Sequence, residues 1–66
     1  MNITVKNYKL HEQYTGEPHE IQIKRRNGWY EVRLDDEFFS TAESLREAQD
    51  VAVDIVIELN LTNVAV

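Results

Sequence analysis

Apolar and polar residues alternate regularly on both sides of Asn27-Gly28, near the middle of the chain. An Asn-Gly pair favours a two-residue hairpin loop of type I′, in which both residues take positive φ. With that loop, Ile23 lies opposite Val32, and apolar residues face apolar residues along both strands. The pattern therefore predicts a hairpin over residues 20–35. Its core face consists of Ile21, Ile23, Tyr30, Val32 and Leu34.

Weaker patterns flank this hairpin. Residues 2–10 alternate with one phase slip and predict an edge strand, whereas residues 11–19 show no pattern, contain the only proline and predict a loop. Residues 35–37 predict a second turn, and residues 38–40 predict a short strand. The pattern leaves open which aromatic side chain of that strand points inward, Phe38 or Phe39.

The C-terminal third of the chain has the periodicity of an amphipathic helix. Ser40 and Glu43 match the capping box that starts many helices, so we expect a helix from this point to about Leu59. Its core-facing stripe consists of Leu45, Ala48, Ala52, Ile55, Val56 and Leu59. An acidic stripe on the opposite side consists of Glu43, Glu47, Asp50, Asp54 and Glu58. Val53 and Ile57 lie beside the acidic stripe, outside the core-facing arc.

Together these elements predict an α+β fold and a single domain over residues 1–66. We expect a small antiparallel three-stranded sheet, in the order β-β-β-α, with one amphipathic helix packed on one face. Residues 60–66 form either a short last strand or a frayed end. A core this small leaves little stability to spare, so a bound partner or a homodimer is a further expectation.

Composition and charge narrow the function. The chain has 66 residues, no Cys and a net charge of −5. The absence of Cys excludes disulfides and thiolate metal sites, and the absence of a long apolar run argues against a membrane span or a signal peptide. We therefore expect a cytoplasmic protein. Residues 1–33 are net basic and residues 34–66 strongly acidic, which argues against general nucleic-acid binding and for a partner with a basic surface.

The acidic stripe is the first candidate binding surface. Solvated helix faces usually mix both signs of charge, but here only Arg46 is placed to relieve the repulsion, through Asp50. Val53 and Ile57 are either an apolar anchor for a partner or second copy, or are covered by the C-terminal tail. The predicted partner-binding residues are Glu43, Glu47, Asp50, Asp54, Glu58, Val53 and Ile57.

The hairpin loop is an alternative, nucleic-acid-binding candidate. An exposed Trp beside cations serves as a stacking platform for bases, or it forms a cation–π pair that stabilises the hairpin. The residues concerned are Lys24, Arg25, Arg26 and Trp29.

Catalytic and metal-binding signals are weak. The chain has no Cys nucleophile and no glycine-rich phosphate loop, so we predict no enzyme activity, no catalytic residues and no cofactor. Two histidines and three glutamates lie close in sequence, but their spacing matches no zinc motif, and we expect no metal. These residues are His11, Glu12, Glu17, His19 and Glu20.

The chain from Gly28 onward resembles the HicB-type antitoxin module over about half of its length. The matching residues are Gly28, Tyr30, Val32, Asp35, Phe39, Leu45, Glu47, Ala48, Ala52 and Ile55. This resemblance implies a partly RNase-H-like α+β module that binds a protein and often oligomerises. The hairpin and helix are also similar to those of double-stranded-RNA-binding domains, and the size and charge resemble those of small acidic phage inhibitors. We therefore expect a non-enzymatic protein-binding module, antitoxin-like or a phage-type inhibitor.

Overall fold

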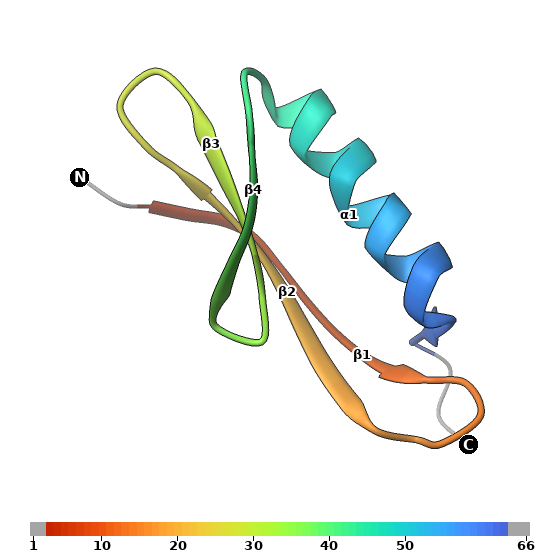
Figure 1. The fold of residues 1–66 in the computed structure, drawn as a ribbon. Coiled ribbons are helices and arrows are strands. Elements are labelled where there is room, and N and C mark those ends of the chain that lie inside the picture. Colours follow the sequence, from red (N-terminus) through yellow and green to blue (C-terminus); the bar gives the residue numbers. More distant parts are fainter. Residues whose placement is uncertain (1–2, 64–66) are drawn as a thin grey trace.

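Five antiparallel strands and one helix make up the part of the chain that the computed structural model describes, residues 3–63 (Figure 1). The strands are β1 (Ile3–Glu12), β2 (Pro18–Arg25), β3 (Tyr30–Leu34), β4 (Glu37–Ala42) and β5 (Leu61–Thr62), and the helix is α1 (Leu45–Leu59). The order in the sheet is β4-β3-β2-β1-β5. The prediction of an α+β fold with one helix is confirmed, but the three-stranded sheet is wrong.

The sheet has five strands because segments near both ends of the chain join it. β1 pairs with β2 from Ile3 opposite Arg25 to His11 opposite Pro18, so its backbone hydrogen bonds extend beyond the predicted edge strand. The expected loop at 11–19 shrinks to a short turn between these two strands. β5 then pairs with His11 and Glu12 at the end of β1. It is the short last strand that was one of the two alternatives predicted for residues 60–66.

The central hairpin has the predicted register, with Ile23 opposite Val32 and Ile21 opposite Leu34. Its loop differs from the prediction, because only Gly28 has a positive φ, of 85°, and Asn27 does not. A positive φ at the second loop residue alone does not match a type I′ turn, which needs it at both loop residues. The next turn instead has positive φ at both loop residues, Asp35 (53°) and Asp36 (66°).

Two bulges explain the irregular alternation in the outer strands. Val5 has no partner on β2, because Thr4 pairs with Lys24 and Lys6 with the next residue, Ile23. This bulge accounts for the phase slip in the alternation of residues 2–10. Phe39 is likewise the extra residue between two β4 residues that pair with β3. Neither Phe38 nor Phe39 is buried in the core, because Phe38 is 59% exposed and Phe39 is 49% exposed.

The helix begins four residues later than predicted. Its N-cap is Ser44, whose side chain accepts a hydrogen bond from the Glu47 backbone N–H at 3.1 Å. Ser40 is not the N-cap because β4 continues to Ala42, which pairs with Tyr30 and is buried. The predicted end is confirmed, since the helix stops at Leu59 and the next residue takes the left-handed conformation that favours a helix C-terminus.

The helix packs on the core face of the sheet. The buried core consists of Ile21, Ile23, Val32, Ala42, Ala48, Ala52, Ile55 and Leu61. Ala48 and Ala52 are small, so the helix backbone can lie close to the sheet. The strongly twisted sheet and its helix form an elongated molecule of 38 × 18 × 17 Å (Figure 1). Within residues 3–63, no helix is both long and apolar enough to span a membrane.

Candidate functional site

The outer surface of α1 carries most of the predicted partner-binding residues. Glu47, Asp50, Asp54 and Glu58 are exposed, Val53 is 53% exposed and Ile57 is 67% exposed. Among residues 3–63, no ion pair involves any of these four carboxylates, and the expected pair between Arg46 and Asp50 is absent. This surface therefore combines unpaired negative charge with exposed aliphatic side chains.

Glu43 does not belong to this helix surface, although it was predicted to. It precedes the N-cap, and its backbone N–H donates to Oε2 of Glu47 at 3.0 Å. Glu47 therefore has a structural role, because its side chain helps to cap the helix.

Apolar grooves run along both flanks of α1. The groove towards β4 has a volume of about 400 Å³ and is lined by Leu34, Phe39, Asp54, Ile55, Glu58 and Leu59. The groove towards β1 has a volume of about 360 Å³, and Tyr8, Leu10, Val53 and Val56 are among its lining residues. No sequence pattern predicts the groove towards β4, because the bulge at Phe39 cannot be recognised from alternation alone.

The β2–β3 loop forms a hollow that brings together most of the predicted nucleic-acid residues. Arg25, Arg26 and Trp29 line this hollow of about 520 Å³, together with Tyr30 and Ile3, whereas Lys24 does not. Trp29 is 39% exposed and Arg25 is exposed. Arg26 is half-buried and binds Glu31 through Nε, at 2.8 Å, and through Nη2.

Glu31 is a buried carboxylate held between two arginines. It lies opposite Lys24 in the predicted register, but its ion pairs are with Arg26 and with Arg33, whose Nη1 is 2.9 Å from Oε2. The hydrogen bonds from Arg26 lower the pKa of Glu31, burial opposes this effect, and the hydrogen bond from Arg33 adds to it. The sequence could not show this cluster, because alternation placed Glu31 on a solvent face.

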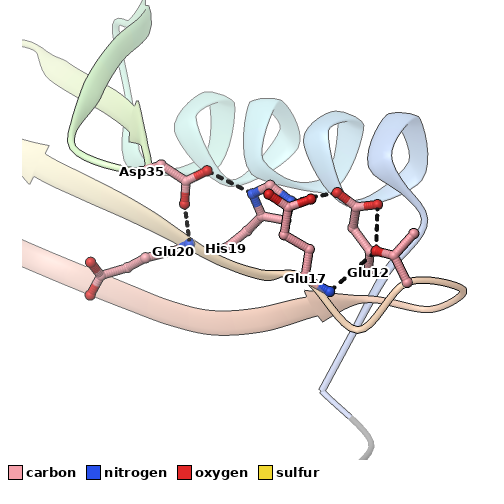
Figure 2. Close-up of polar contacts among 6 residues, drawn as sticks. Glu12, Glu17, His19, Glu20 and Asp35 are labelled. Atoms are coloured by element: carbon pink, nitrogen blue, oxygen red, sulfur yellow. Dashed lines mark hydrogen bonds and ion pairs between the residues drawn. The ribbon is translucent and has the colours of Figure 1, made fainter.

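His19 joins three segments of the chain (Figure 2). Its Nδ1 is 2.6 Å from Oδ2 of Asp35, and its Nε2 is 2.7 Å from Oε2 of Glu12. These hydrogen bonds, first to Glu12 and then to Asp35, raise the pKa of His19. The hydrogen bond with His19, and a second from Thr15, lower the pKa of Glu12. Burial alone would raise the pKa of Asp35, but hydrogen bonds from His19 and from the Glu20 N–H lower it overall.

Glu12, Glu17 and His19 together have the donor atoms for a divalent cation. One ligand atom from each lies within 4.8 Å of the other two. Both ring nitrogens of His19 already bind carboxylates, however, so a cation would have to displace one of these carboxylates from the ring. His11 and Glu20 are not members of this trio. The cluster is therefore complete as a hydrogen-bonded link between strands.

No family model, curated protein or solved structure gives a significant match to the chain. The likeness to HicB-type antitoxins and to double-stranded-RNA-binding domains stays a prediction, and functional inference depends on the surfaces described above.

Proposed function

We propose that this chain is a non-enzymatic docking module that binds a protein with a basic surface through the outer surface of α1. The observation that supports this proposal is that Val53 and Ile57 are exposed beside Asp50, Asp54 and Glu58. Within residues 3–63, none of these three carboxylates forms an ion pair. Unpaired like charges cost the helix stability, and a basic partner would remove that cost. An antitoxin-like or phage-type inhibitor is the biological role that fits such a module.

The two kinds of residue on this surface have different roles in docking. The carboxylates attract a basic surface over distance and increase the association rate. Val53 and Ile57 are one helical turn apart and present aliphatic area that a partner can desolvate. Desolvated apolar contacts at the centre of an interface usually slow dissociation.

The proposal is tested with charge-reversal variants used as baits for affinity capture from the native host. We expect Asp50→Lys, Asp54→Lys and Glu58→Lys, combined in one chain, to lower the association rate with a captured partner at least tenfold. Glu47 is left unchanged because it caps the helix. Glu37→Lys, an exposed acid on β4, is the matched control and should bind normally. A partner that binds the triple variant and the control equally would contradict the proposal.

A further inference from the structure

The hollow at the β2–β3 loop has the chemistry of a second binding site, independent of α1. Arg25 and Arg26 contribute guanidinium groups to it, and Trp29, Tyr30 and Ile3 contribute apolar surface. Its volume of about 520 Å³ falls in the range of small-molecule sites, which suits one or two nucleotides.

The cations around this hollow outnumber the acids, although the whole chain is acidic. Arg25 and Arg26 line the hollow and no acid does, whereas Lys24 lies opposite Glu31 in the register and Arg33 pairs with Glu31. Two of these cations, Arg26 and Arg33, bind Glu31, and this contact fixes the guanidinium of Arg26 at the edge of the hollow. Lys24 and Arg25 have no ion pair with any group of residues 3–63. Arg25, which lines the hollow, is therefore available to an anion.

Trp29 supplies an aromatic surface beside this charge. Its side chain is 39% exposed. Within the described residues, its indole N–H makes none of the side-chain hydrogen bonds that stabilise the fold. A base can stack on an exposed indole regardless of its identity, while an arginine beside it binds the adjoining phosphate.

The acidic surface of α1 does not cancel this local charge. Figure 1 shows α1 running away from the β2–β3 loop, towards the opposite end of the molecule. Asp50, Asp54 and Glu58 lie in the last two thirds of this helix. At physiological ionic strength, exposed charges are screened over about 8 Å, so carboxylates far along α1 act only weakly on the loop.

We propose that this hollow binds single-stranded nucleic acid, with a base stacked on Trp29 and a neighbouring phosphate bound by Arg25 and Arg26. A single strand fits better than a duplex, because a loop tip can reach splayed bases but offers no element that fills a groove. The site takes one or two nucleotides and reads no sequence, so the binding is weak and depends on salt.

The test uses dT12 and U12 with the intact chain, unlabelled where Trp29 emission is read and fluorescein-labelled where anisotropy gives the affinity. Trp29 is the only tryptophan, so quenching of its emission reports stacking directly. We expect both probes to quench Trp29 at about 50 mM salt, and the plot of log affinity against log salt to have a negative slope of roughly 0.7 per phosphate bound. Arg25→Ala should weaken binding about threefold or more and reduce this slope by about 0.7. Trp29→Ala should weaken binding about tenfold, and Trp29→Phe should restore most of it.

Controls separate this site from general attraction to positive charge. Lys9→Ala removes an exposed cation from a distant part of β1 and should leave affinity unchanged. Arg26 is not substituted, because its loss would disturb Glu31. Circular dichroism verifies that each variant is folded. The proposal is overturned if neither probe binds at low salt, if Lys9→Ala weakens binding as much as Arg25→Ala, or if a 12-base-pair duplex or inorganic polyphosphate binds as tightly as dT12.

Discussion

Glu31 illustrates how a charged residue on the face of the sheet opposite the helix becomes one of the most buried in the chain. It is 5% exposed, yet its two oxygens are shared between Arg26 and Arg33. Each guanidinium brings several donors and stays ionised, so the carboxylate is satisfied without water. Arg33 also donates to the backbone O of Asp36, which links Glu31 to the β3–β4 turn. The cluster therefore fixes both ends of β3 on this face.

His19 is the residue whose protonation should matter most for stability. Protonated, it donates to Glu12 and Asp35 at once, but the neutral ring has only one N–H and must release one carboxylate. The pKa of His19 is raised in the folded chain, so its contribution is complete below the unfolded value near 6.5 and is lost as pH rises through the folded pKa. The pKa values of Glu12 and Asp35 are lowered, so their contribution is lost in acid.

We therefore predict that the free energy of unfolding, measured by urea titration, decreases from pH 6 to pH 8.5 in the wild type. His19→Gln should show a smaller decrease, because it cannot carry the charge. His11→Gln is the control, since His11 makes no ion pair with the acids around His19, and it should keep the wild-type difference. Equal decreases in the wild type and His19→Gln would show that the cluster does not couple protonation to folding.

At the scale of elements, the register of the hairpin was predictable, whereas the full length of the neighbouring strands and the number of strands in the sheet were not. The register of β2 and β3 follows from local information, because apolar residues must share a face on either side of a short loop. The pairing of β5 with β1 depends on contacts between segments that are distant in the sequence. Val5 and Phe39 lie at bulges that disturb the alternation in β1 and β4. Site residues that follow a local pattern, such as the acids of α1, could be predicted from the sequence. Glu31 could not, because its burial depends on the side chains of Arg26 and Arg33.

The helix start shows how two equal local signals are resolved by tertiary contacts. Both Ser40 and Ser44 are followed by a Glu three positions later, so both match the capping box. The structure uses Ser44 because extending β4 buries Ala42 and completes its pairing with β3. Neither the propensity nor the periodicity of residues 40–44 contains this information.

This assignment makes a matched prediction for the two serines. Ser44→Ala should lower the free energy of unfolding by about 1 kcal/mol, because the Glu47 N–H loses its acceptor. Ser40→Ala should change it by less than about 0.5 kcal/mol, because its hydroxyl makes only a 3.4 Å hydrogen bond to the neighbouring Thr41 O. Urea unfolding followed by circular dichroism measures both. A larger loss of stability in Ser40→Ala than in Ser44→Ala would show instead that Ser40 is the N-cap.

The net charge is divided along the sequence, basic in residues 1–33 and acidic in residues 34–66, and the acidic surface of α1 bears on self-association. Two copies that met through Val53 and Ile57 would also bring two sets of Asp50, Asp54 and Glu58 together. Like charges at that distance repel, whereas a basic partner would be attracted. The same surface that favours a basic partner therefore opposes a homodimer at low ionic strength.

We predict that light scattering at low salt gives the 7.8 kDa mass of one chain. At about 1 M salt the screening length falls to about 3 Å, so any association through the apolar pair should emerge only there. Ile57→Asp should abolish that association, while Phe38→Asp, an exposed aromatic on β4, should leave it intact. A doubled mass at low salt that Ile57→Asp returns to one chain would show instead that the aliphatic contact outweighs the repulsion. The partner of α1 would then be a second copy of this chain.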